Sequence, residues 1–450
     1  MSQSADSATT ASLDGQSAGG ALLSRLRAVA LRRRALLGTV AASFFVFALQ
    51  AVQGMLLARV LGPEGRGQYN TALFYTHLLM FAGMLGIPFV IQRRAASSSS
   101  ASKGSLRGLS MASIGAALIT GLASVVVVGL LSYFTLPSEK QSLVPLCLLA
   151  AISLPLLHVR LALQAVDRGS ENFLRHNVSD VFFWAVLPMM LCYLWWSGSG
   201  DVEWVVGLSV TAALAAAAFR LALGRLADFT WPPDPRPRTL LREGMPYALA
   251  KGVSDVLNRL DGLLVLLLAT FTVQGYYAAA VPAAGMLSVA PAALAMFAFN
   301  TGAKGPARIS GRRLAMASGL SVAMQVVSAV VLALLLPTLM LLVFGEEFAG
   351  AIPFALALVP AKAVAGVGQI AEGYLRGRNK PHIEFRARLA GGAILLTTAV
   401  VAWPWLHEFS IPLAALAGHA FPTVVMGAAI LWDARGGHAT PKSGHSASGV

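Results

Sequence analysis

One apolar stretch of the chain, residues 240–270, is interrupted by four charged side chains of balanced sign, and this pattern is the most suggestive of chemistry. In a continuous helix, with about 100° per residue, the six polar residues at its middle fall inside one arc of roughly 160°. They are Lys251, Ser254, Asp255, Asn258, Arg259 and Asp261. The opposite arc carries Val253, Val256, Leu257, Leu260, Leu263 and Leu264.

A charge at mid-bilayer depth costs about 2.5–3.5 kcal/mol on insertion scales, so a membrane-crossing helix cannot turn these charges toward lipid. They must face a protein interior or a water-filled cavity. The two positive and two negative charges can neutralise each other in a static bundle, or they can line a hydrophilic pathway. We favour the pathway and keep the static bundle as the alternative.

The elements that position these residues are predicted to be membrane-spanning helices. Apolar residues make up 56% of the 450 and charged residues only 12%, whereas soluble domains carry about 25% charged residues. Since about 20 apolar residues cross a bilayer as a helix, twelve stretches are long enough to span. They are 36–59, 67–92, 107–133, 142–166, 177–197, 203–225, 240–270, 273–300, 313–343, 351–375, 385–405 and 410–432. The expected fold class is an all-α polytopic membrane protein.

The positive charges alternate along the chain as the positive-inside rule requires. With the N-terminus inside, only three Lys or Arg residues fall in the outer loops: Arg59, Arg66 and Lys140. This distribution predicts that both termini are cytoplasmic. It also explains the net charge of +14 without nucleic-acid binding, because the cations follow the inner face instead of one patch.

A linker divides the twelve spans into six and six. Residues 226–239 contain four prolines, which prevent a continuous helix. Gly67-Gln68-Tyr69 and Gly275-Tyr276-Tyr277 open the second span of each half, which favours an internal duplication. Such repeats typically place a substrate site between the halves, near the membrane midplane. The expected organisation is a disordered basic tail at 1–34, a six-helix bundle at 35–225, the linker, a second bundle at 240–432 and a disordered tail at 433–450.

The sequence lacks the motifs of a motor, a metal site or an enzyme. Gly302-Ala303-Lys304-Gly305 has neither the spacing nor the hydroxyl of a nucleotide-binding loop. The eight histidines show no ligand spacing such as H-E-x-x-H. We therefore expect a transporter without a cofactor or a bound metal, and no catalytic residues.

Four segments together resemble the polysaccharide or lipid-linked oligosaccharide flippases of the multidrug/oligosaccharidyl-lipid/polysaccharide exporter superfamily. They are Leu-Leu-Ala-Arg-Val-Leu-Gly-Pro-Glu-Gly-Arg-Gly-Gln-Tyr at 56–69, Glu-Gly-Met-Pro-Tyr-Ala-Leu at 243–249 with Leu-Asn-Arg-Leu-Asp at 257–261, Gly-Tyr-Tyr-Ala-Ala-Ala at 275–280 and Phe-Gly-Glu-Glu-Phe at 344–348. Arg66 departs from the apolar or aromatic residue that is common there. The resemblance covers most of residues 36–432 and implies two six-helix bundles arranged as a V around a central cavity.

The resemblance also implies a substrate, a polyprenyl-pyrophosphate-linked oligosaccharide, moved across the cell inner membrane by alternating access. The positively charged cavity would then bind the pyrophosphate through Arg259, Lys251 and Lys362, beside Asn258. Arg59 would contact the substrate near the outer face during release. Asp255 and Asp261 would either neutralise these cations or carry a coupling H⁺ or Na⁺. Membrane lipids and polysaccharide polymerase or assembly proteins are the expected partners.

Two rival functions remain open on the sequence. A cation-coupled exporter of drugs or metabolites shares the architecture, but it would need a compact apolar or aromatic site. A membrane-embedded glycosyltransferase or polymerase is the rival from another class, and Asp201-Val202-Glu203 is its one outer carboxylate pair. We interpret that pair as an acidic turn.

Overall fold

The computed structural model describes residues 6–98, 103–198, 200–224, 233–303, 311–378 and 380–436, and the regular elements in these ranges are helices. The first half contains α1 (Asp6–Ala82), α2 (Ile87–Ser98), α3 (Lys103–Thr135), α4 (Val144–Ala151), α5 (Leu154–Gly169), α6 (Phe173–Ser197) and α7 (Val202–Ala222). The second half contains α8 (Pro237–Leu257), α9 (Leu260–Leu268), α10 (Phe271–Gly285), α11 (Val289–Ala303), α12 (Gly311–Phe344), α13 (Ala351–Gly377), α14 (Pro381–Leu406) and α15 (Ser410–Gly436). Short 3₁₀ turns join several of them: η1 (Ser138–Leu143), η3 (Met286–Ser288), η5 (Glu346–Phe348) and η6 (His407–Phe409). The all-α fold class is confirmed.

Each of the twelve expected spans follows one helix or a pair of successive helices. Among the described residues, eight stretches are long and apolar enough to cross a membrane, or nine with the bent pair 138–151 and 154–169. Two of these stretches, 41–97 and 381–432, each carry two of the expected spans. The first turns at Gly62, whose φ of 62° and ψ of −177° interrupt α1 ahead of Pro63. The charged span 240–270 is divided between α8 and α9 and is the one expected span outside this set.

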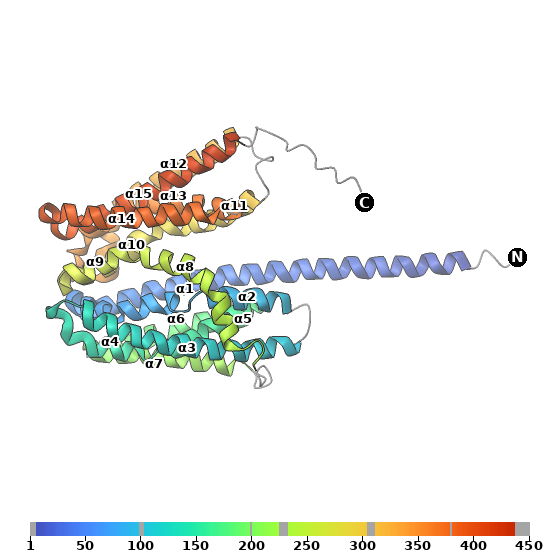
Figure 1. Ribbon diagram of the computed structural model, residues 1–450, viewed down its shortest axis with the longest axis horizontal. Coiled ribbons are helices and arrows are strands. Elements are labelled where there is room, and N and C mark those ends of the chain that lie inside the picture. Colours follow the sequence, from blue (N-terminus) through green and yellow to red (C-terminus); the bar gives the residue numbers. More distant parts are fainter. Residues whose placement is uncertain are drawn as a thin grey trace.

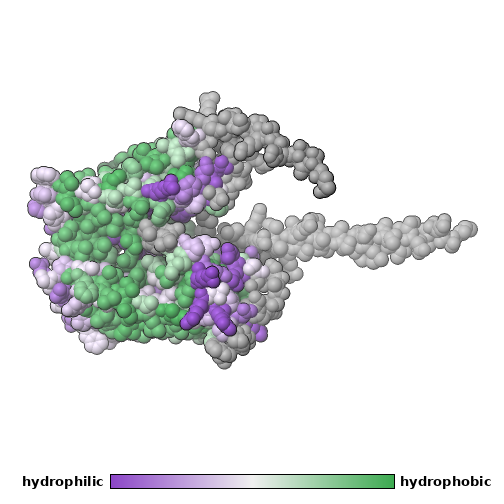
Figure 2. Space-filling model, viewed as in Figure 1, coloured by the Kyte–Doolittle hydropathy of each residue, from purple (hydrophilic) through white to green (hydrophobic). Residues whose placement is uncertain are grey.

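The helices form two bundles that meet at one end and diverge toward the other (Figure 1). We call the end at which they meet the closed end, and the end at which α1 begins and α15 finishes the open end. Figure 2 shows a hollow between the bundles at the open end, and an apolar band around the molecule between two hydrophilic ends. Large apolar side chains such as Leu320, Val330 and Leu334 are exposed along α12. An apolar surface of this extent on helices is what a lipid bilayer covers.

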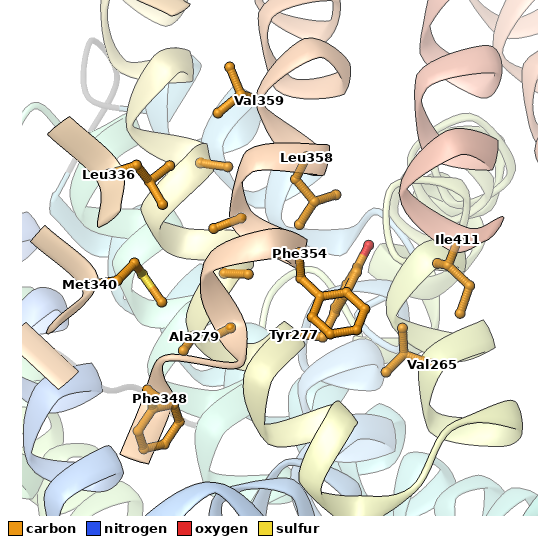
Figure 3. Packing of buried hydrophobic residues seen from close by; sticks show 14 of the residues in the cluster. Val265, Tyr277, Ala279, Leu336, Met340, Phe348, Phe354, Leu358, Val359 and Ile411 are labelled. Atoms are coloured by element: carbon orange, nitrogen blue, oxygen red, sulfur yellow. The ribbon is translucent and has the colours of Figure 1, made fainter. Parts of the chain in front are cut away.

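One apolar core joins the helices of the second half (Figure 3). Its members come from α9, α10, α12, α13, η5 and α15, and the larger ones are Val265, Tyr277, Leu336, Met340, Phe348, Phe354, Leu358, Val359 and Ile411. Ala58 of α1 also belongs to this core, so the first half contributes to it. Between helices surrounded by lipid, van der Waals packing of this kind supplies much of the association.

The charged stretch is not one continuous helix. Asn258 and Arg259 form a turn between the end of α8 and the start of α9. Arg259 has φ −117° and ψ 7°, and its N–H donates to the oxygen of Val256 at 3.0 Å, which is the tighter spacing of a turn. The expectation of a single polar arc is therefore wrong across this break, because the helical rotation does not continue through it. The apolar arc beyond the break packs as predicted, with Leu260 buried against Leu395.

The two ends of this broken span pack against different bundles. Leu240, near the start of α8, is buried in the core of α2, α3 and α5 in the first half. Glu243 accepts a hydrogen bond from Arg94 of α2 at 3.0 Å. The expected start of the second bundle at residue 240 thus lies, in space, against the first bundle. Residues 226–232 of the predicted linker lie outside the described residues.

The N-terminal segment differs from the disordered tail expected at 1–34. α1 begins at Asp6 and continues through this segment without a break before Gly62. The segment is rich in alanine, leucine and arginine, which are strong helix formers, so local propensity accounts for the helix. Residues 437–450 of the predicted C-terminal tail lie outside the described residues.

A buried ion network joins the helices of the first half near the open end. Asp167 of α5 is fully buried and contacts Arg175 of α6 at 2.6 Å and Arg220 of α7 at 2.7 Å. The second half repeats this arrangement at the end of α13, where Glu372 pairs with Arg376 and Arg388. In both halves a carboxylate near the end of the fourth span therefore holds the helices that follow.

Replacing Asp167 by alanine should strongly destabilise the protein. Arg220 is only 1% exposed, so the substitution leaves a buried guanidinium without its carboxylate, which costs about 3–5 kcal/mol. Thermal unfolding of the purified protein in detergent checks this expectation. Asp201→Ala is the matched control, because Asp201 is exposed at the start of α7 and its side chain caps no helix. Equal unfolding temperatures for the two variants would contradict the structural role.

Candidate functional site

Two arginines of the first half donate to the backbone of the second half at the closed end. Arg59 of α1 donates to the oxygen of Leu342 at 3.0 Å and to that of Val343 at 3.4 Å, both on α12. Arg66 is 6% exposed and donates to the oxygen of Ala278 on α10 at 3.1 Å. Its guanidinium also lies over the ring of Phe344 and that of Phe348, at 5.3 Å and 5.9 Å from the centroids.

Lys140 of η1 makes the third contact of this kind. Its ammonium is buried and donates to the oxygens of Leu266 at 2.6 Å and Ala269 at 2.7 Å, and to Oε1 of Gln274 at 3.2 Å. The two carbonyls belong to the last turn of α9, where the helix itself supplies no partner and a cation is favoured. We call Arg59, Arg66 and Lys140 the seal cations. They are the three cations that the charge pattern placed in the outer loops.

Two glycines allow the halves to touch beside the seal cations. A Cβ atom on Gly67 would lie 1.8 Å from the oxygen of Phe271, and one on Gly275 would lie 1.8 Å from the oxygen of Pro63. These contacts are reciprocal, since each glycine lies four residues after the residue that its counterpart touches. The duplicated motifs therefore face each other directly across the closed end.

Replacing Lys140 by glutamate should open the closed end. The carboxylate would face three oxygen acceptors and the negative end of α9, so the contact changes from attractive to repulsive. Spin labels on cysteines at Glu64 and Glu347, in a background without Cys147 and Cys192, should report a longer distance. Glu139→Lys serves as the control, because Glu139 is the exposed neighbour of Lys140. An unchanged distance in Lys140→Glu would show that the ammonium does not hold the halves together.

A cavity of about 390 Å³ lies in the first half, and Arg259 is one of the residues that line it. Its wall comes from α1, α4, α5, α6 and α7, with Gln50, Gln53 and His77 on α1 and Trp184 on α6. We call it the first-half cavity. Arg259 is placed there by the turn between α8 and α9, so a residue of the seventh span serves a cavity of the first bundle.

The guanidinium of Arg259 makes no direct ion pair in this cavity. It is half-buried, and among the described residues no hydrogen bond or ion pair reaches it, although the charges of Asp255 and Asp261 act on it from a longer distance. A cation that is partly removed from water and has no carboxylate in direct contact costs free energy. An anionic group that enters the cavity could supply that direct contact.

Asn258 faces a different cavity from its neighbour Arg259. This second-half cavity of about 210 Å³ is lined by Asn258, Lys362, Arg388 and His419, among others. Nη1 of Arg388 donates to Oδ1 of Asn258 at 2.6 Å and so fixes the side chain that precedes Arg259. The turn between α8 and α9 thus sends two adjacent polar side chains into opposite bundles.

Asp261 is bonded within the second half. Its Oδ2 accepts a hydrogen bond from the hydroxyl of Tyr277 at 2.9 Å and lies 4.0 Å from Nζ of Lys362. Its Oδ1 accepts from the N–H of Gly262 at 2.8 Å. Lys362 is therefore within ion-pair distance of a carboxylate, whereas Asp255 and Asp261 act on Arg259 only from a longer distance.

A third, mostly apolar cavity of about 680 Å³ adjoins the two polar ones. It lies between α1, α10, η3 and α12, and it is lined by side chains such as Phe47 and Leu336. Gln50 lines both this cavity and the first-half cavity, and Lys362 lines both this cavity and the second-half cavity. The three cavities are therefore neighbours, with Arg259 at the first and Lys362 at the other two.

The structure brings only part of the predicted set together. Arg259, Asn258 and Lys362 line the cavities, and Arg59 lies at the closed end. Asp255 is half-buried on α8 and lines none of the three cavities. The side chain of Lys251 lies outside the described residues. Among the described residues, no three side chains of His, Cys, Asp or Glu come together as metal ligands.

Four cavity residues were missed by the sequence reasoning, and a signal for them existed. They are Gln50, Gln53, His77 and Trp184. Polar side chains within otherwise apolar spans are costly to bury. The two glutamines in the first span and the histidine in the second are therefore candidate site residues on the same grounds as the charged residues. For Trp184 the sequence offers no comparable signal.

Comparisons with known proteins bear on this arrangement. A sequence model of the family described as polysaccharide biosynthesis protein matches residues 35–299. A search among curated proteins finds no match. The structure is similar to an inward-facing multidrug resistance MATE family transporter of the MOP superfamily, with a TM-score of 0.73 and 12% identity over 87% of this chain and 96% of that chain.

Two further solved structures share the architecture. The lipid II flippase MurJ, in an inward closed conformation, gives a TM-score of 0.66 and 12% identity over 87% of each chain. A MATE family transporter in an outward-facing conformation gives 0.60 and 12% identity, over 89% of this chain and 94% of that chain. At this level of identity the likeness shows the fold alone, which the chain shares with these three proteins.

Proposed function

The chain belongs to the polysaccharide biosynthesis protein family, and from this premise we propose that it moves a polyprenyl-pyrophosphate-linked oligosaccharide across the cytoplasmic membrane. The observation that carries the proposal is the unpartnered guanidinium of Arg259 in the first-half cavity. A pyrophosphate supplies an anionic partner in direct contact, and a guanidinium binds phosphate oxygens through two parallel hydrogen bonds. Arg259 is therefore the proposed pyrophosphate-binding residue.

The proposed transport cycle alternates between the two ends of the molecule. With the open end taken as cytoplasmic, as the charge pattern predicts, the seal cations close the outer face while the cavities receive substrate from inside. Breaking the seal and closing the open end would release the glycan outside. Arg59, proposed from the sequence as a release contact, would become available for the substrate when its bonds to α12 break.

The pair of Asp261 and Lys362 is the proposed coupling element. Asp261 lies in a cluster with Tyr277 and Lys362, beside the cavity that contains His419. Protonation of Asp261, or binding of Na⁺ near it, would loosen its hold on Lys362. A cation taken up there would change the charge of the second half and so favour one conformation over the other. Asp255 stays a second candidate for this role.

Reconstituted vesicles provide the test of the substrate. Lipid-linked oligosaccharide from a strain lacking this protein is placed in the membrane, and its arrival at the other leaflet is followed with a membrane-impermeant lectin. Protein-dependent appearance of the glycan is the expected result. Transport of a small organic cation such as ethidium, without movement of the glycan lipid, would establish the drug-exporter alternative instead. Interaction with a polysaccharide polymerase stays a prediction.

A further inference from the structure

The first-half cavity contains uncharged polar groups that also lack partners. Thr76 is 3% exposed, it lines the cavity, and its Oγ1 has no hydrogen-bond partner. The amides of Gln50 and Gln53 line the same cavity, and neither makes a hydrogen bond among the described residues. A buried polar group without a partner costs about 1–3 kcal/mol, so a single such group calls for an explanation.

An aromatic wall lies beside these polar groups. Phe183 and Trp184 of α6 both line the cavity, with ring centroids 5.0 Å apart and planes at 76°. The guanidinium carbon of Arg160 lies over the ring of Phe183, 3.9 Å from its centroid. Arg160 is itself paired with Asp180 at 2.7 Å, which fixes its position against the ring. The indole of Trp184 is half-buried and remains available to a ligand.

This combination fits the chemistry of a sugar ring. A pyranose presents a face of C–H groups, which packs on an aromatic ring, and an edge of hydroxyls, each of which both donates and accepts hydrogen bonds. Amides such as Gln50 and Gln53 offer a donor and an acceptor side by side, and Thr76 adds a hydroxyl. A polyprenyl chain would leave these groups unpaired, and the positive charge of Arg259 disfavours an organic cation.

We propose that the first-half cavity binds the sugar residue attached directly to the pyrophosphate, with Gln50, Gln53 and Thr76 bonding its hydroxyls and Trp184 packing on its face. The proposal rests on the proposed function, because it takes Arg259 as the pyrophosphate partner. It adds that the protein recognises the glycan through the sugar residue attached directly to the pyrophosphate. The first-half cavity has a volume of about 390 Å³, near the lower end of the range for small-ligand pockets. This size suits one sugar residue rather than an oligosaccharide.

Shortened lipids make the test direct. Farnesyl pyrophosphate, alone or carrying one glucose, galactose or N-acetylglucosamine residue, is titrated calorimetrically into the full-length protein in lipid nanodiscs. At least one sugar-bearing probe should bind about tenfold more tightly than the sugar-free one, as one or two extra hydrogen bonds provide. Gln53→Leu and Thr76→Val should remove this difference while leaving the affinity for farnesyl pyrophosphate unchanged.

Stability separates a binding role from a structural one. Since Oγ1 of Thr76 has no partner, Thr76→Val should leave the unfolding temperature unchanged or raise it. Gln369→Leu is the control amide, because Gln369 lines the second-half cavity, and it should keep the preference for the sugar-bearing probe. If the wild type binds no sugar-bearing probe more tightly than farnesyl pyrophosphate, the sugar site is wrong while pyrophosphate binding stands. If farnesyl pyrophosphate and its sugar-bearing forms all fail to bind, the proposed function itself fails.

Discussion

Replacing Arg259 by alanine should abolish glycan export while leaving the protein folded in the membrane. The guanidinium makes no hydrogen bond or ion pair among the described residues, so its removal breaks no bond of either kind there and loses only the longer-range attraction of Asp255 and Asp261. It should in contrast weaken binding of the pyrophosphate by about tenfold to a hundredfold, because hydrogen bonds to charged groups are worth about 1.5–3 kcal/mol. Surface glycan in a strain whose own copy is deleted, together with the unfolding temperature, gives both readouts.

Arg259→Lys distinguishes charge from geometry at this position. An ammonium binds as a point charge and cannot form the two parallel bonds of a guanidinium, so partial export would show that charge alone suffices. Arg386→Ala is the control, since Arg386 is an exposed cation on α14. Lys362→Met should behave differently from Arg259→Ala and lower the unfolding temperature, because it leaves Asp261 without its cation. Full export by Arg259→Ala would remove the basis of the pyrophosphate site.

Gly275→Ala should prevent the closed end from forming. The new Cβ would lie 1.8 Å from the oxygen of Pro63, a backbone atom that cannot rotate away, so the two halves must separate. Overpacking of this kind typically costs about 1–3 kcal/mol, which is enough to change which conformation dominates. Export should be lost, and spin labels at Glu64 and Glu347 should lie farther apart.

Gly207→Ala is the matched control for this prediction. Gly207 lies within α7, and a Cβ there meets nothing within 4 Å. Alanine in the interior of a helix is favoured over glycine by roughly 0.5–1 kcal/mol, so this variant should be neutral or slightly more stable. A Gly275→Ala protein with normal export and an unchanged label distance would show that the close contact is not required.

The membrane-capable stretches could be predicted from the sequence because they follow from composition alone. Apolar length sets the spans, and the three cations expected in the outer loops all lie together at the closed end. The polar arc could not be predicted past Asn258, because a helical rotation of 100° per residue assumes a continuous helix. The turn at Arg259 places the side chains of Asn258 and Arg259 at separate cavities. The local sequence contains no signal that predicts this turn.

The close contacts of Gly67 and Gly275 across the closed end also could not be predicted from the sequence. Gly67 and Gly275 were recognised as equivalent positions in a duplicated chain, but equivalence does not imply contact. Their reciprocal approach depends on how the two bundles cross, which is a tertiary property. The lack of a direct ion pair at Arg259 is likewise visible only in three dimensions, because Asp255 and Asp261 are close to it in sequence and neutralisation was one of the two roles predicted for them.

The seal cations, which hold the closed end together, all belong to the first half of the chain. Arg59, Arg66 and Lys140 supply the donors, and their acceptors in the second half are almost all backbone oxygens. A carbonyl is present whatever side chain a residue carries, so the second half can change sequence at these positions without losing the bonds. Loss of a donor cannot be repaired in the same way, because no side-chain change restores it from the other side. Compensating substitutions for a lost seal cation should therefore arise within the first half, and the two halves of the chain are free to diverge unequally along this border.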